Sequence, residues 1–490
     1  MSTLADPRQA QAFRFVRCDY AGGVAELVYA FDAGPELVER IRFPDAPALP
    51  EARKAAFDAA LRMLHFIAGI SYYKAGLPPR IEVETVAPDA ATADLLDALY
   101  LHGLGEFAYR NGLDLRGRIA FPRGSHSVSA ILTSLSRPGN GRDPEPRMEK
   151  KLNPGPGSSP GQALRRDDES AAHLGLSRRT LVPIGGGKDS LVVVEALKKT
   201  GIEATATWVG TSPLIAGVAA RTGLPMLNIA RELSPVLFDY NRMGAWNGHI
   251  PVTAINSAIL ACAAVLYGFD AIAFANERSA SAATLEYEGQ QVNHQWSKGW
   301  AFEEMFAAWL HSHVASDLDY FSLLRPFSEL AVTRAFAKSG AAYFDAFSSC
   351  NRNFKILGPK PADRWCGQCP KCHFVFLALA PFVPKPRLLQ IFGRNLLDDE
   401  TQAAGFDALI EFHDHKPFEC VGEASEARAA FAVLATRPEW REDALVSRFR
   451  EDIAPQLDTA QLALQPWLQP AGEHGVPLRF ARALDAIRGA

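Results

Sequence analysis

A turn of three consecutive glycines followed by a charged pair and a serine is the strongest chemical signal in the sequence: Gly185, Gly186, Gly187, Lys188, Asp189 and Ser190. An apolar run precedes the turn and a helical pattern follows it. Because glycine has no Cβ, such a turn can direct backbone N–H groups at an anion, and the dipole of the following helix adds positive potential. The pattern therefore predicts a phosphate-binding loop. The alternative is a glycine-rich turn that binds nothing.

Neither of the two common glycine-rich nucleotide motifs fits this turn. A Walker A loop requires Gly at position 182 and Ser or Thr after the lysine, but the chain has Val182 and Asp189. A dinucleotide fingerprint requires Gly where Ser190 stands. An acidic side chain beside phosphates would repel them unless a divalent cation lay between the two anions. We therefore expect Asp189 to hold magnesium.

Four cysteines late in the chain have the spacing of a metal site: Cys350, Cys366, Cys369 and Cys372. Two-residue gaps let neighbouring thiolates bind one ion, and Cys350 supplies the fourth ligand from a preceding loop. Four thiolates leave no position for water, so we expect structural zinc, with an iron–sulfur cluster as the alternative and His373 as a possible replacement ligand. The chain begins without a signal-peptide pattern, so we expect a reducing cytoplasmic location, which disfavours disulfides.

Composition narrows the class of protein. The chain has 490 residues and a formal net charge of −4, so we expect several domains and no nucleic-acid partner, for which a basic domain would be typical. The longest apolar stretch, residues 258–267, is half the length of a membrane span, which predicts no membrane insertion. The sequence carries no signal of an oligomeric state.

Residue patterns divide the chain into four regions. The predicted order is an N-terminal α+β domain over 1–135, a Pro/Gly-rich linker or lid over 136–170, an α/β domain over 171–385 and a mostly helical C-terminal region over 386–490. In the first region, β-prone runs at 13–16, 24–29 and 41–43 predict an antiparallel sheet. They precede a helix over 51–66, a strand over 81–86 and a helix over 94–102.

The α/β region alternates strands and helices, which predicts a parallel sheet covered on both faces. Strands are expected at 181–184, 204–209, 226–229 and 271–274, and helices at 191–199, 214–222 and 253–266. Ligands of such sheets bind at the carboxyl ends of the strands. Trp208 ends the second strand, where it could stack on adenine or equally be a buried aromatic residue. Polar runs at 276–279 and 292–298 are further candidates for this site.

The Gly-Gly-x-Asp-Ser loop resembles the PP-loop of ATP pyrophosphatases, although Gly185 stands where that superfamily has Ser. With the four cysteines, residues 180–380 are similar to 7-cyano-7-deazaguanine synthases. Further segments are similar to the UDP-N-acetylmuramoyl-L-alanyl-L-glutamate epimerases (MurL) over nearly the whole chain: 69–74, 103–107, 276–280, 292–298 and 415–420. That resemblance implies ATP and magnesium as cofactors. It also implies a UDP-linked muramoyl dipeptide substrate whose terminal L-Glu becomes D-Glu through an acyl-adenylate, with release of AMP and pyrophosphate.

This chemistry assigns expected roles to the loop. Asp189 would hold magnesium on the pyrophosphate, Gly186, Gly187 and Ser190 would donate hydrogen bonds, and Lys188 would offset phosphate charge. An acyl-adenylate acidifies the neighbouring C–H bond, so a general base of ordinary strength suffices.

Three residues are candidates for that base, namely His294, Lys298 and Cys420, and the sequence does not choose among them. A lone Cys420 is also typical of a small buried residue. Two other functions stay open: a PP-loop enzyme that adenylates a nucleobase, RNA or another acceptor, and a non-catalytic nucleotide-binding module.

Overall fold

The protein is described from a computed structural model for residues 4–124, 171–355, 359–413 and 416–490. The predicted linker, residues 136–170, lies outside the described residues. Among the helices of the described ranges, none has the length and apolar character needed to cross a membrane.

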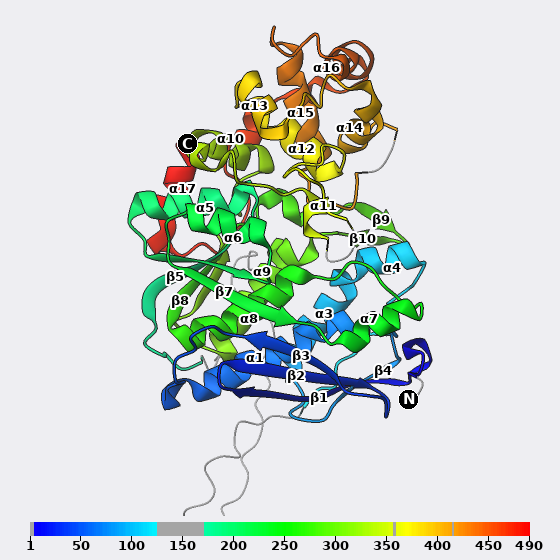
Figure 1. The fold of residues 1–490 in the computed structure, drawn as a ribbon, viewed down its shortest axis with the longest axis vertical. Coiled ribbons are helices and arrows are strands. Elements are labelled where there is room, and N and C mark those ends of the chain that lie inside the picture. Colours follow the sequence, from blue (N-terminus) through cyan, green and yellow to red (C-terminus); the bar gives the residue numbers. More distant parts are fainter. Residues whose placement is uncertain (1–3, 125–170, 356–358, 414–415) are drawn as a thin grey trace, which may run out of the picture.

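One mixed sheet of nine strands runs through the described part of the chain (Figure 1). The spatial order is β11-β8-β5-β6-β7-β3-β2-β1-β4. The strands are β1 (Ala12–Ala21), β2 (Val24–Phe31), β3 (Leu37–Arg42), β4 (Arg80–Val83), β5 (Ser177–Pro183), β6 (Ala204–Val209), β7 (Met226–Glu232), β8 (Phe269–Phe274) and β11 (Asp319–Ser322). Strands β11, β8, β5, β6 and β7 pair in parallel, whereas β3, β2 and β1 are antiparallel. The predicted α/β class is confirmed.

The N-terminal strands continue the parallel sheet. Strand β3 pairs with β7 in antiparallel register, with Arg40 opposite Glu232. At this junction Arg231 donates a 2.7 Å hydrogen bond to the fully buried Glu39 and a 2.9 Å bond to Ser71. A buried carboxylate is tolerated when it is paired in this way. The strands on both sides of the predicted boundary at 135 therefore belong to one sheet.

Helices cover both faces of the parallel strands β5, β6, β8 and β11, as the alternating pattern predicted, whereas β1–β4 contribute core residues to one face only. One face packs against α1 (Lys54–Ala68), α3 (Ala90–Gly103), α8 (Val252–Tyr267) and α9 (Trp300–His313). The other face packs against α5 (Lys188–Thr200), α6 (Pro213–Arg221), α10 (Glu329–Ser339), α12 (Pro370–Leu379) and α17 (Ala481–Arg488). Neighbouring residues of β5 divide between the two cores, Leu181 in the first and Val182 in the second. This is the two-residue period of a strand buried on both sides.

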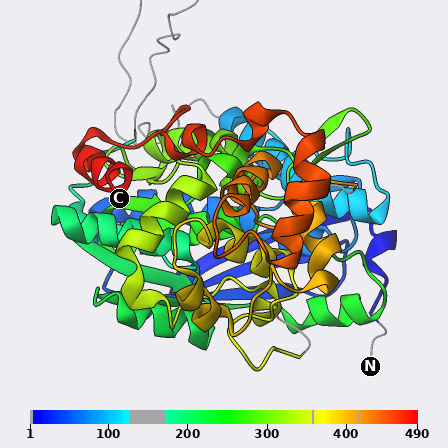
Figure 2. The same cartoon turned by 90° about the horizontal axis from the view of Figure 1, so that it is seen from above.

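The C-terminal region is mostly helical, as predicted, and packs onto the second core. Its helices are α13 (Lys385–Phe392), α14 (Ala403–Leu409), α15 (Ala424–Ala435) and α16 (Ala444–Arg448). In Figure 2 these orange helices lie in front of the sheet. The predicted strands and helices of the first two structured regions are present, with boundaries that differ by a few residues. The sequence prediction missed β11, α9, α7 (Pro235–Arg242) and the hairpin of β9 (Leu285–Tyr287) and β10 (Gln290–Val292).

Candidate active site

A cavity of about 340 Å³ opens at the carboxyl ends of the parallel strands. Strand ends supply Pro183, Thr207, Trp208, Val209, Phe274 and Asn276, and the glycine turn supplies Gly185, Gly187, Asp189 and Ser190. This is the edge of an open α/β sheet at which ligands bind. Trp208 borders the cavity and is 9% exposed, so it is both a cavity residue and largely buried.

The glycine turn has the geometry of an anion-binding loop. Gly186 has a φ of +86°, which favours glycine, and a Cβ there would lie 3.3 Å from the carbonyl oxygen of Ser348. The backbone N–H of Ser348 donates a 2.9 Å hydrogen bond to the carbonyl of Gly186 and fixes the turn. Helix α5 begins directly after Gly187, so its positive end faces the cavity. A Cβ at Gly185 would contact nothing within 4 Å, so the turn itself does not demand glycine there.

Lys188 and Asp189 form an ion pair of which only Asp189 borders the cavity. Asp189 borders the cavity, and although burial alone would raise the pKa of this carboxyl, the neighbouring ammonium of Lys188 lowers it below its ordinary value. Lys188 itself is 1% exposed, pairs with Asp189 at 2.5 Å and with Glu329, and is not among the cavity residues. Asp189 is therefore the ionised oxygen donor that reaches the cavity, and Lys188 pairs with it although Lys188 does not border the cavity. The expected role of Lys188 in offsetting phosphate charge stays a prediction.

All three candidate bases meet on one side of this cavity. Cys420 and Lys298 border it, and the Lys298 ammonium donates a 3.2 Å hydrogen bond to the Cys420 sulfur. His294 lies behind the thiol, with its Nδ1 2.5 Å from a carboxylate oxygen of Glu106 in α4 (Gly105–Asn111). The imidazole of His249 lies against that of His294, with ring centroids 4.3 Å apart.

This environment favours a thiolate and an imidazolium. Burial alone would raise the pKa of Cys420, but the positive charge of Lys298 and a hydrogen bond with His294 lower it to about 5. Burial alone would lower the pKa of His294, but hydrogen bonds with Cys420 and Glu106 raise it to about 9. Burial lowers the pKa of His249 to about 4, so that imidazole is neutral. A cysteine that is ionised near neutral pH is both a base and a nucleophile.

Two buried cationic side chains hold the backbone of the segments that carry Lys298 and Cys420. The guanidinium of Arg325, 2% exposed, donates to the carbonyls of Lys298 at 2.6 Å and Glu277 at 2.9 Å, and pairs with Glu303 at 2.6 Å. The ammonium of Lys371 donates to the carbonyl of Cys420 and also borders the cavity. Groups held by buried partners keep their geometry, which a reaction centre requires.

Several site residues were missed in the sequence analysis as individual candidates. Glu106 lies in the segment 103–107 that resembles the MurL epimerases, but nothing in the sequence connected it or His249 with His294. Arg325 and Lys371 had no motif to mark them, because their roles depend on contacts between segments distant in sequence.

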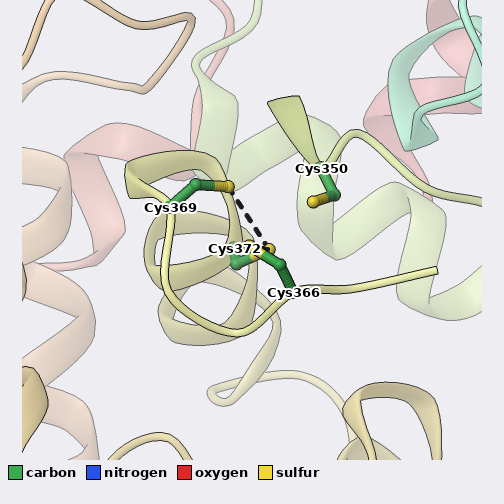
Figure 3. Close-up of side chains that lie close together, drawn as sticks. All are labelled: Cys350, Cys366, Cys369 and Cys372. Atoms are coloured by element: carbon green, nitrogen blue, oxygen red, sulfur yellow. Dashed lines mark hydrogen bonds between the residues drawn. The ribbon is translucent and has the colours of Figure 1, made fainter. Parts of the chain in front are cut away.

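The four cysteines converge as predicted (Figure 3). The four Sγ atoms all lie within 4.8 Å of one another. The Sγ–Sγ distance is 3.4 Å between Cys369 and Cys372 and 3.8 Å between Cys366 and Cys372. Sulfurs arranged tetrahedrally at zinc bonds of about 2.3 Å are about 3.8 Å apart, so this donor set fits zinc. Four thiolates also fit an iron–sulfur cluster. Cys350 follows Ser349, which borders the cavity, so the cluster braces the segment that holds the glycine turn.

Comparison with known proteins covers nearly all of the chain. The model of the MurL N-terminal domain matches residues 4–140 and 156–323, and that of the MurL C-terminal domain matches 346–464. A UDP-N-acetyl-alpha-D-muramoyl-L-alanyl-L-glutamate epimerase of Xanthomonas oryzae pv. oryzae is 55% identical over 96% of both chains. Proteins of the same name from Salinispora tropica and a Micromonospora species are each 39% identical, over 98% and 97% of this chain and 97% and 98% of their own. The chain therefore belongs to the MurL family.

Proposed function

We propose that this chain is an ATP-dependent epimerase that converts the terminal L-Glu of UDP-N-acetylmuramoyl-L-Ala-L-Glu to D-Glu in peptidoglycan precursor synthesis. The names of its relatives supply the reaction and the substrate. One observation carries the mechanism: the Cys420 thiolate and the glycine turn with Asp189 border the same cavity. An activating step and a proton transfer can therefore act on one bound carboxylate.

The activating step is adenylation, as in the PP-loop enzymes that the turn resembles. An oxygen of the substrate α-carboxylate attacks the α-phosphorus of ATP, the bond to the bridging oxygen breaks, and pyrophosphate leaves. The N–H groups of the turn and Ser190 would bind the phosphates, Trp208 would contact adenine, and Asp189 would hold magnesium, which when bound draws charge from the leaving pyrophosphate. The product is a mixed anhydride of glutamate and AMP.

The second step removes the α-proton. In a free carboxylate this would create a dianion, but in the anhydride the electron pair passes onto a neutral carbonyl oxygen. The Cys420 thiolate is the proton acceptor, and the ammonium of Lys298 at 3.2 Å from its sulfur stabilises the enolate that forms. A proton that comes from solvent on the opposite face of the enolate gives the D centre, and the proton taken by Cys420 is released to solvent. Water then cleaves the anhydride to AMP and the glutamate carboxylate.

The test is the fate of the α-hydrogen in deuterated water with ATP, magnesium and UDP-N-acetylmuramoyl-L-Ala-L-Glu. We expect solvent deuterium at the glutamate α-carbon together with AMP, and no D-Glu product without ATP. Cys420→Ala should still release pyrophosphate but lose deuterium incorporation by at least a hundredfold, whereas Cys18→Ala, in strand β1, should behave as the unaltered protein. If AMP forms while the α-position keeps its protium and configuration, the chain adenylates for another purpose and the proposal is wrong.

A further inference from the structure

A second cavity, of about 350 Å³, lies directly beside the first. Glu419 and Pro370 border the second cavity, and the next residues along the chain, Cys420 and Lys371, border the first. Consecutive Cα atoms are about 3.8 Å apart, so the two cavities share walls one residue thick. In the substrate of the proposed function, L-Ala and the N-acetylmuramoyl sugar lie between the glutamate and the diphosphate. A substrate whose glutamate reaches Cys420 is therefore long enough to extend to the second cavity, since the dipeptide alone spans about 7 Å.

The second cavity combines aromatic surfaces with positive charge. The rings of Tyr109 and Phe418 lie 5.3 Å apart, and the guanidinium of Arg110 lies 5.2 Å from the centre of the Phe418 ring. Tyr109 is 36% exposed, which is high for a tyrosine packed against two other aromatic rings, and the side chain of Arg110 is 54% exposed. Lys416 also borders the cavity. Aromatic faces stack on nucleobases, and Arg and Lys bind phosphates.

One acidic residue borders the cavity, and its charge is reduced. Burial raises the pKa of Glu419 to about 7, and Asn351 donates a hydrogen bond to this carboxyl group. At neutral pH it is half protonated and repels a diphosphate less than an ordinary carboxylate would.

We propose that this second cavity binds the uridine diphosphate portion of the substrate, with uracil on the rings of Phe418 and Tyr109 and the diphosphate on Arg110 and Lys416. The identity of the nucleotide rests on the proposed function. Arg110 also pairs with Glu106 at 2.5 Å, and Glu106 contacts His294. Arg110 would therefore both bind the diphosphate and contact the Glu106 carboxylate that pairs with His294 beside the Cys420 thiolate.

The primary test is calorimetric titration of the full-length protein with UDP alone, without ATP or peptide. Phe418→Leu keeps an apolar side chain but loses the aromatic face, and should raise the Kd for UDP at least fivefold. It should also raise the KM for the UDP-linked dipeptide while leaving kcat/KM for the muramoyl dipeptide without UDP unchanged. Phe382→Leu, a partly buried residue that borders neither cavity, should change neither constant. Arg110→Gln should weaken UDP binding more than Arg116→Gln, which removes an arginine paired with Asp114 and Glu288.

Photo-crosslinking provides a measurement on the unaltered protein. Irradiation with 5-iodo-UDP should label the peptide that contains Tyr109 or Phe418. Labelling elsewhere, no UDP binding at millimolar concentration, or unchanged Kd in both Phe418→Leu and Arg110→Gln would overturn the inference. If UDP binds at these residues but the dipeptide is not epimerised, the subsite stands and the proposed function fails. If the dipeptide is epimerised but UDP does not bind at these residues, the proposed function stands and the subsite proposal fails.

Discussion

Replacing Lys298 with methionine should raise the pKa of Cys420 by about 2 to 4 units. A unit charge 3.2 Å from the sulfur contributes about 5 kcal/mol at the effective dielectric constant of about 20 that suits partly buried pairs. One pKa unit corresponds to about 1.4 kcal/mol, so this interaction accounts for most of the lowering of the pKa to about 5. In the variant, the hydrogen bond with His294 still lowers the pKa of Cys420. We therefore expect a pKa between about 7 and 9.

The assay is the pH dependence of alkylation by iodoacetamide, followed by mass spectrometry of the peptide that contains Cys420. The rate follows the thiolate fraction, so at pH 6 Lys298→Met should react at least about tenfold more slowly. Lys298→Arg retains the charge and should keep the midpoint near 5, and Lys198→Met, which removes an exposed lysine paired with Glu195, should not move it. A midpoint below about 6 in Lys298→Met would refute the electrostatic reasoning.

Three further results are expected. Asp189→Ala should lower pyrophosphate release at least a hundredfold while the protein stays folded through the remaining Lys188–Glu329 pair, and the exposed Asp58→Ala should have no effect; retention of more than about a tenth of the activity would contradict a metal-binding role. Cys369→Ser should lose bound metal and lower the Tm by several degrees before it affects turnover, and a metal-free protein of full stability would exclude a structural site. The pH profile of kcat/KM should be bell-shaped, because Cys420 is protonated below about 5 and His294 loses its proton above about 9; a flat profile across this range would contradict the ion pair.

Local sequence signals predicted the elements that build the sheet. Alternating apolar runs gave the parallel strands and their covering helices, because each run carries its own period and its own turn residues. Strand β11 was missed because its four residues, Asp319–Ser322, do not alternate between apolar and polar side chains. Helix α9 was missed because aromatic and apolar residues occur around much of its circumference, which weakens the 3.6-residue pattern. The pairing of β3 with β7 joins residues almost 200 positions apart and leaves no local trace.

The candidate site shows the same division between local and distant information. The glycine turn and the cysteine cluster were recognised because spacing along the chain defines their chemistry. The choice among His294, Lys298 and Cys420 was impossible, since the low pKa of the thiol arises only when the three side chains meet. The pairing of Lys188 with Glu329, which lies 141 residues further on, likewise had no signal in the local sequence.

The candidate reaction centre combines residues that are far apart in the chain, so the order of synthesis determines when it can form. Glu106 leaves the ribosome early, the glycine turn follows, and Cys420 emerges more than 200 residues after the turn. At translation rates of about 5 to 20 residues per second, that interval lasts on the order of ten seconds or more. The acidic thiol therefore comes into being only after Cys420 has been synthesised, long after Glu106 and the glycine turn. Nascent or truncated chains carry an ordinary cysteine at most, which is far less open to oxidation and alkylation than the thiolate of the finished enzyme.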